Sequence, residues 1–112
     1  MKLIQAVIRP SALTAVRAAL TAAGIGGISV AEASSCVTQD TLVRGEQAQI
    51  HRERCAMDMQ MEIAVTDVQL ACALEAISSA VPEGHWGEGE IHVVRLSQAR
   101  RIRTGDINDK AL

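Results

Sequence analysis

The sequence contains neither Phe nor Tyr, and Trp86 is its single aromatic residue. The buried area must therefore come from Ala, Val, Ile, Leu and Met, and Ala contributes little of it. The 112 residues suffice for one domain and not for two. Because oligomerisation commonly completes a small domain with a thin core, we expect several copies of this chain to associate.

The chain also lacks an excess of positive charge and any long apolar run. Its formal net charge of −2 argues against a general nucleic-acid binder, which would present a basic face. No apolar window is long enough to span a membrane, and the apolar start is too short and too interrupted for a signal peptide. We therefore expect a cytoplasmic protein that is not embedded in a membrane. Cys36, Cys55 and Cys72 are odd in number and contain no Cys-x-x-Cys pair, which argues against a disulfide framework.

A polar stretch from Cys36 to Ala56 lies between two segments that are typical of strands. It has no clean period of two and no sustained apolar stripe. A connection of this length in a small domain is usually functional or disordered. We interpret the single domain, residues 1–112, as a scaffold that presents residues 36–56 as a long loop to a partner protein.

Alternating apolar and polar residues predict four strands, over 2–9, 28–35, 57–65 and 91–96. In the first strand Ile4, Ala6 and Ile8 share one face. Apolar stripes at helical spacing predict a helix after the first strand and another after the third. The stripes consist of Leu13, Val16 and Leu20, and of Leu70, Leu74, Ile77 and Val81.

Capping residues delimit both predicted helices. Ser11 is the expected N-cap of the first helix and Thr66 or Asp67 that of the second; Gly24 and Pro82 end them. The order strand, helix, strand, loop, strand, helix, strand is βαβ repeated. It predicts an α+β, ferredoxin-like double βαβ fold with a four-stranded antiparallel sheet and both helices on one face. Another subunit is then expected to cover the other face.

Two segments are candidates for anion binding. The glycine turn at 83–90 contains Gly84, Gly87 and Gly89, and its N–H groups would hold an anion, although a turn that needs positive φ explains it as well. In the C-terminal segment, 97–112, Arg100 precedes Arg101 and Arg103. In a strand these last two arginines would point to one side and grip a phosphate or carboxylate, although a solvated basic tail is the simpler alternative.

Cys36, His51 and Cys55 lie near the two ends of the polar stretch, where they suit a soft metal such as Zn or Cu(I). His85 or His92 would complete such a site, yet the spacing matches no structural zinc motif. A reversible disulfide between Cys36 and Cys55 is the alternative. No catalytic constellation is recognisable, so we expect no enzyme.

Both ends of the chain and its glycines resemble the PII family of signal-transduction proteins. The ends carry Met1-Lys2-Leu3-Ile4-x-Ala6-Val7-Ile8-Arg9-Pro10 and Arg101-Ile102-Arg103-Thr104-Gly105-Asp106. Between them lie Gly24-Ile25-Gly26-Gly27-Ile28-Ser29-Val30-x-Glu32, Gln39, Arg44-Gly45, Glu62-Ile63 and Gly84-x-x-Gly87-x-Gly89-x-Ile91. The resemblance covers the whole chain and is weaker in the polar stretch.

This resemblance implies a homotrimer that binds an adenine nucleotide, ADP, AMP or ATP, in the clefts between subunits and regulates nitrogen metabolism. It also implies that the loop docks on a membrane transporter or a metabolic enzyme. Carried onto this chain, the nucleotide-binding residues are Val7, Ser29, Gln39, Glu62, Ala64, Gly87, Glu88, Gly89, Glu90, Arg101 and Arg103. Within this set Gln39 is expected near 2-oxoglutarate and the magnesium that accompanies ATP. The partner-docking residues are Arg44, Gly45, His51, Arg52 and Arg54.

Acidic residues replace two lysines of the family pattern, at Asp58 and Glu90. The first lysine pairs with 2-oxoglutarate and the second with the phosphates, so each replacement turns attraction into repulsion. The loop tyrosine that is uridylylated in some members is also absent. We therefore expect no 2-oxoglutarate response, and better binding of ADP or AMP than of ATP. The alternative is a PII-like trimer that senses a metal, a redox state or a small anion such as bicarbonate.

Overall fold

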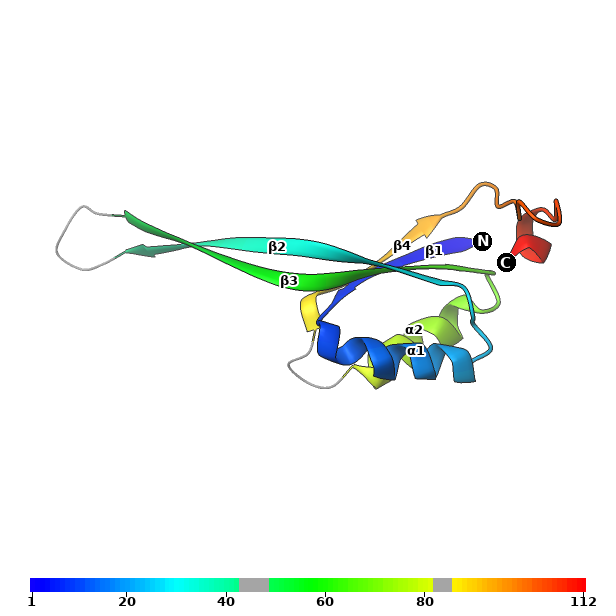
Figure 1. Ribbon diagram of the computed structural model, residues 1–112, viewed down its shortest axis with the longest axis horizontal. Helices are drawn as coiled ribbons and strands as arrows, with labels where there is room; N and C mark the ends of the chain where they lie inside the picture. Colours follow the sequence, from blue (N-terminus) through cyan, green and yellow to red (C-terminus); the bar gives the residue numbers. More distant parts are fainter. Residues whose placement is uncertain (43–48, 82–85) are drawn as a thin grey trace.

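Four strands and two α-helices make up most of the described part of the chain in the computed structural model (Figure 1). The backbone is described for residues 1–42, 49–81 and 86–112, and side chains for these residues except 35, 37–42, 49–55 and 86–89. The elements are β1 (Lys2–Ile8), α1 (Leu13–Ala22), β2 (Ile28–Leu42), β3 (Gln49–Val65), α2 (Leu70–Ala80) and β4 (Trp86–Arg95). Short 3₁₀ turns, Pro10–Ala12 and Asn108–Ala111, precede α1 and end the chain.

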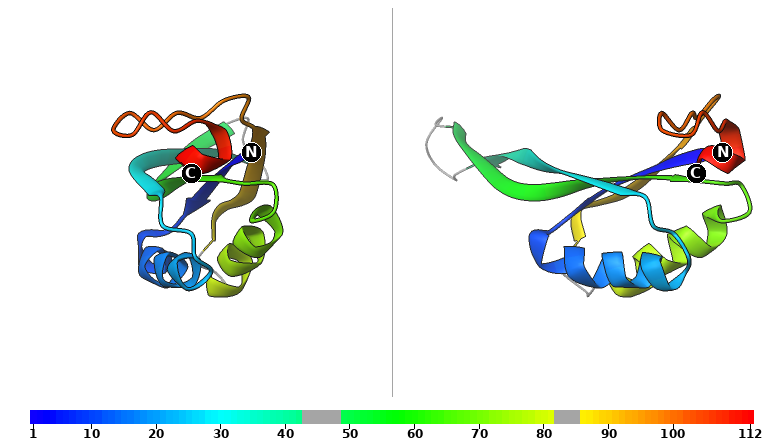
Figure 2. Two further views of the ribbon diagram at one scale, coloured as in Figure 1. Left: turned by 90° about the vertical axis from the view of Figure 1, so that its right-hand side faces the viewer. Right: turned by 45° about the vertical axis from the view of Figure 1, so that its right-hand side comes forward.

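The four strands form one antiparallel sheet in the order β2-β3-β1-β4. Both helices lie against the same face of this sheet (Figure 2). The predicted ferredoxin-like double βαβ fold is therefore confirmed. In the described part of the chain neither α-helix covers the opposite face of the sheet, and the C-terminal segment with its 3₁₀ turn lies at one end of that face (Figure 2).

The core lies between the sheet and the helices, where the predicted alternation places it. Ile4, Ala6 and Ile8 of β1 are buried together with Met61, Ile63 and Val65 of β3. Val16, Leu20, Ala73 and Ile77 of the helices join this cluster, as do Ala12, Ile25 and Val81 at the helix ends. The predicted stripe residues Leu13, Leu70 and Leu74 pack at its margin.

Local hydrogen bonds explain where the helices begin and end. Gly24 has a φ of +78° and ends α1, while the N–H of Ile25 donates to the carbonyl of Leu20 at 2.9 Å, as in a Schellman motif. Thr66 and Gln69 exchange hydrogen bonds in a capping box before α2. Val81 has extended geometry, as expected of a residue before a proline. The predicted cap at Ser11 is wrong, because Ser11 lies inside the 3₁₀ turn that precedes α1.

The predicted strand boundaries around the polar stretch are also wrong. β2 continues to Leu42 and β3 begins at Gln49, so most of residues 36–56 form a paired antiparallel ribbon rather than a loop. The ribbon extends well away from the body of the protein (Figure 1). Because a ribbon outside the body has no core to face, its strands need no apolar alternation, and the sequence pattern does not reveal them.

β4 begins at Trp86, before the predicted start at Ile91. A regular ladder from the Ala6–Ile91 pair would place Gly89 opposite Ile8, but Ile8 pairs with Trp86 instead. This register shift accommodates extra residues in β4, and glycine commonly occupies such irregular positions. The predicted turn at 83–90 is thus partly strand; its remainder lies outside the described residues.

Candidate functional site

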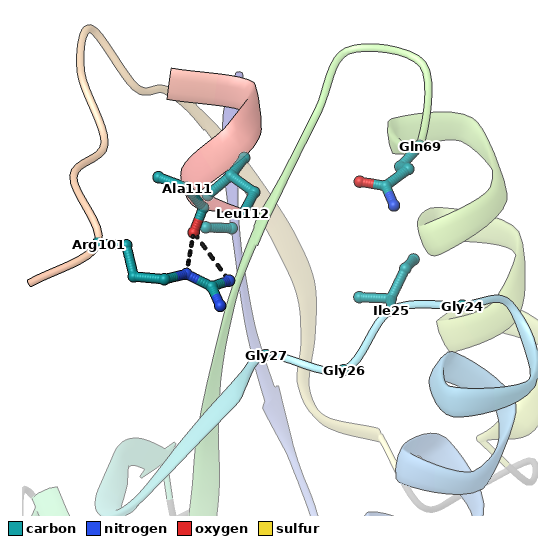
Figure 3. Close-up of a pocket in the computed structure, with 9 residues that line it drawn as sticks. Gly24, Ile25, Gly26, Gly27, Gln69, Arg101, Ala111 and Leu112 are labelled. Atoms are coloured by element: carbon teal, nitrogen blue, oxygen red, sulfur yellow. Dashed lines mark hydrogen bonds between the residues drawn. The ribbon is translucent and has the colours of Figure 1, made fainter. Parts of the chain in front are cut away.

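A cavity of about 580 Å³ lies where the α1–β2 connection meets the C-terminal segment (Figure 3). Three parts of the sequence surround it: the α1–β2 connection, the end of β3 with the start of α2, and the C-terminal segment. They contribute Gly24, Ile25, Gly26 and Gly27; Ala64 of β3; Gln69 before α2; and Arg101, Ala111 and Leu112. Its volume is within the range of about 300–1,000 Å³ that is usual for small-molecule sites.

The glycine connection forms an open wall of this cavity. A Cβ atom added at Gly26 or Gly27 would meet no atom within 4 Å, so these residues face open space rather than a packed neighbour. Ile25, which precedes Gly26, is buried in the core and anchors the connection. A bound group can therefore approach the backbone at Gly26 and Gly27 closely.

Arg101 supplies the cationic side of the cavity. It belongs to a tight turn in which its N–H donates to the carbonyl of Asp106 at 2.9 Å and its carbonyl accepts from Gly105 N–H at 2.8 Å. Gly105 has a φ of +78°, and an isolated bridge between Arg100 and Ile107 closes the turn. The segment is therefore a turn and not a strand, so the condition under which Arg101 and Arg103 would point to one side is not met.

The guanidinium of Arg101 is held in place by the chain itself. Nε and Nη2 donate to the carbonyl oxygen of Ala111 at 3.2 and 3.1 Å (Figure 3). These two bonds use only part of the guanidinium's donor set, so other N–H groups stay available to an anion. Arg103 lies in the same turn and is exposed.

A second, smaller hollow lies on the sheet face that carries no helix. It encloses about 150 Å³ and is lined by Gln5, Val7, Gln60, Glu90 and His92. The Nε2 groups of Gln5 and Gln60 donate to Oε1 of Glu62 at 2.8 and 3.3 Å. His92 Nε2 lies 3.0 Å from Glu90 Oε2. This hollow is below the usual volume of a nucleotide-sized site.

Within a single chain, the predicted binding residues whose side chains the structure describes lie in two separate places. Ala64 and Arg101 line the cavity, whereas Val7 and Glu90 line the hollow. Glu62 lies two residues from Ala64 on the same face of β3 and pairs with Gln5 of the hollow. It therefore lies between the cavity and the hollow. Ser29, at the start of β2, is exposed and pairs with Glu62 in the strand register.

Other predicted residues fall beyond what the structure describes. Arg44 and Gly45 lie outside the described residues, as do the side chains of Gln39, His51, Arg52, Arg54, Gly87, Glu88 and Gly89. Conversely, the sequence interpretation missed Gln69 as a lining residue. Its signal was the Thr-x-x-Gln spacing of the capping box, which places a polar side chain at the helix start.

Two residues of the long ribbon, Asp58 and Cys36, have environments that the sequence pattern alone did not decide. Asp58 belongs to the polar side of β3 but is only 5% exposed. Cys36 is disulfide-bonded, which agrees with the disulfide expected as the alternative to a soft-metal site. Among the side chains that the structure describes, no group of three His, Cys, Asp or Glu residues is arranged to hold a metal.

No helix in the described part of the chain is long and apolar enough to cross a membrane.

Comparisons with known proteins agree on one family. The family model described as nitrogen regulatory protein P-II matches residues 1–106. The chain is 35% identical to the nitrogen regulatory protein P-II of Rhizobium etli over 112 residues, and 33% identical to the nitrogen regulatory protein GlnK of Escherichia coli strain K12 over 115 residues. Each alignment covers all of both chains.

Solved structures of Bacillus subtilis GlnK share the fold. One has a TM-score of 0.84 at 22% identity and covers 99% of this chain and 97% of its own. The structure of its complex with ATP has a TM-score of 0.87 at 22% identity, with 99% and 96% covered. Since the family model spans nearly the whole chain and full-length relatives exceed 30% identity, the chain belongs to the nitrogen regulatory protein P-II family.

Proposed function

We propose that this protein is a trimeric regulator that binds an adenine nucleotide between subunits and signals to a target protein through the β2–β3 ribbon. The observation that carries the proposal is the cavity that contains Arg101 beside the open glycine connection. A guanidinium with spare donors suits a phosphate group, because Arg binds phosphate with two parallel hydrogen bonds. The Bacillus subtilis relative was solved as a GlnK–ATP complex, which supports the nucleotide class.

The division of the expected binding residues between two places supports a site shared by neighbouring subunits. Arg101 and Ala64 would contribute one side, and Val7 and Glu90, from the hollow, the other. The sheet face between them carries Leu3, Val7 and Ala64, which are only partly buried in one chain. Association through this face would bury them and give the thin core the support that it lacks.

The charge around the hollow favours a nucleotide with few phosphates. Glu62 and Glu90 are both acidic, and Glu90 stands where the family pattern has a phosphate-binding lysine. Each added phosphate increases repulsion from these carboxylates. We therefore propose that ADP and AMP bind more tightly than ATP. If ATP binds, magnesium is required, and Gln39 would lie beside that magnesium.

The ribbon provides the output of this proposed regulator. It extends far beyond the body, with its tip, residues 43–48, outside the described part (Figure 1). We propose that the ribbon and the residues that it carries, Arg44, Gly45, His51, Arg52 and Arg54, dock on a cytoplasmic enzyme or on the cytoplasmic face of a transporter. This assignment makes the protein a binding module and not an enzyme.

Calorimetric titration of the purified protein with AMP, ADP and ATP, each with and without magnesium, tests the proposal. Light scattering should give a mass of about three times the 11.9 kDa of one chain. Arg101→Ala should weaken nucleotide binding by roughly 10- to 150-fold, since a hydrogen bond to a charged group contributes about 1.5–3 kcal/mol. Arg17→Ala, on the exposed side of α1, is the matched control and should bind normally. Absence of binding by all three nucleotides at millimolar concentration would contradict the proposal.

A second candidate function is a PII-like trimer that responds to redox state, a metal or bicarbonate. The disulfide at Cys36 favours the redox version among these. It predicts that partner binding changes with thiol oxidation in the absence of any nucleotide. A metal version is tested by metal content after purification without added chelators, and bicarbonate by titration of bicarbonate into the nucleotide-free protein.

A further inference from the structure

The β2–β3 ribbon loses the support of the sheet partway along its length. β1 pairs with β3 from Val65 only as far as Met59, which lies opposite Ile8. Beyond Met59, every pair that the structure describes for β3 is with β2. An isolated two-stranded hairpin is marginally stable in water, so this outer part needs another source of order.

The side chains on the core-facing side of the ribbon lose their burial over the same distance. Ile63 and Met61, opposite Ile28 and Val30, are fully buried. Farther out, Met57 is 59% exposed, and its sulfur accepts a hydrogen bond from the hydroxyl of Ser34 at 3.3 Å. Hydrophobic packing therefore no longer holds the two strands together at this point.

The next pair on this side of the ribbon is Cys36 and Cys55. Directly opposed residues in an antiparallel pair have Cα atoms about 4.5 or 5.5 Å apart. Both separations lie within the range of roughly 4.4–6.8 Å that a disulfide requires. Cys36 is disulfide-bonded and Cys72 is a free thiol. Among the three cysteines of the sequence, this leaves Cys55 as the candidate partner within one chain.

We propose that Cys36 and Cys55 form a redox-reversible crosslink that fixes the register of the outer ribbon and thereby controls how its tip is presented. Cys36 is exposed, so a small disulfide such as oxidised glutathione reaches it. In the oxidising direction the S–S bond of glutathione breaks and a bond between the sulfurs of Cys36 and Cys55 forms. Two molecules of reduced glutathione leave with the two protons and the electron pair. Reduction is the reverse exchange.

Because the crosslink lies outside the body of the protein, its loss should destabilise the part of the ribbon beyond it and leave the body unchanged. Crosslinking restricts the open states of the chain that it encloses, residues 37–54. Without it, this weakly patterned ribbon is free to open or slip, because register is strongly specified only where one face is buried. The buried pairs of β1 and β3 should be indifferent to the redox state.

Peptide mapping tests the crosslink itself. Trypsin cleaves after Arg44, Arg52 and Arg54, which separates Cys36 from Cys55, but no Lys or Arg separates Cys55 from Cys72. The experiment therefore uses Cys72→Ser protein, equilibrated with oxidised or reduced glutathione and alkylated before digestion. We expect the Cys36 and Cys55 peptides to be joined after oxidation and separate after reduction. Full alkylation of Cys36 after oxidation, or a link between two chains, would overturn the proposal.

Hydrogen exchange tests the consequence for the ribbon. Amides between Cys36 and Cys55 should exchange about tenfold faster after reduction, while those of β1 stay unchanged. Cys36→Ser protein should exchange at the fast rate in both buffers, and Cys72→Ser protein should behave as the unmodified protein does. Equal ribbon exchange in the two redox states would refute a controlling role. Neither readout involves a nucleotide, so failure here is distinct from failure of the proposed nucleotide site.

Discussion

The capping box before α2 is a sensitive test of how the cavity wall is built. Thr66 N–H donates to Gln69 Oε1 at 3.2 Å, and Gln69 N–H donates to Thr66 Oγ1 at 3.3 Å. The hydroxyl of Thr66 also donates to the same Oε1 at 3.1 Å. Gln69 lines the cavity, so these bonds orient a cavity residue while they satisfy two N–H groups of the first helical turn.

Thr66→Ala should lower the free energy of unfolding by about 1 kcal/mol, the usual cost of replacing a good N-cap by alanine. Gln69→Ala should cost a similar amount, because it removes the acceptor of the Thr66 N–H group. Both variants break the same reciprocal contacts. The double variant should therefore lose about 0.5–1.5 kcal/mol less than the sum of the two.

Urea unfolding of the unmodified protein, the two single variants and the double variant measures this coupling. All four are compared at one protein concentration, because association changes apparent stability. Thr21→Ala is the matched control. The Thr21 hydroxyl donates to the Arg17 carbonyl on the exposed side of α1, and its loss should change stability by less than about 0.5 kcal/mol. Strictly additive losses would show that the Thr66–Gln69 pair does not act as a unit.

Two further predictions concern charge. The amino group of Met1, 3.0 Å from Asp67, lowers the pKa of that carboxyl through a hydrogen bond and Coulomb attraction, with Lys2 adding to it. This stabilisation is present above the unfolded pKa of about 3.9 and is lost as pH falls through the lower folded value. Urea unfolding should therefore show that Asp67→Asn protein is less stable than the unmodified protein at pH 7, and that this difference vanishes in acid. A difference in stability that persists in acid would contradict the prediction. Separately, 2-oxoglutarate should give no binding heat with Mg-ATP-saturated protein at physiological concentration, because Asp58 and Glu90 replace two cations; micromolar binding would refute this.

The sequence predicted the body of the fold well because burial imposes a period on it. Ile4, Ala6 and Ile8 alternate with half-buried residues, as a strand with one covered face requires. Gly24 ends α1 with positive φ, as its position after the apolar stripe indicated. Where no core constrains the side chains, the prediction was wrong: β2 and β3 continue through a stretch that showed no alternation.

The candidate site was predictable only in part. Ala64 and Arg101 were expected at a binding site and do line the cavity. Arg101 lies in a turn, and its guanidinium donates to the Ala111 carbonyl. The local sequence shows that an arginine is present, but it does not show that this arginine bonds the Ala111 carbonyl. That contact depends on how the chain folds back after Gly105.

The sequence by itself thus determined the order of the helices and strands, which of their faces are buried, and which cysteines are available for a crosslink. The tertiary structure alone decided which distant segments meet, such as Gly26 with Arg101 at the cavity. It also decided that Cys36 and Cys55 oppose each other in the ribbon. The physical reason is that periodicity records which side of an element is buried, whereas strand register and chain reversal determine what lies across from it.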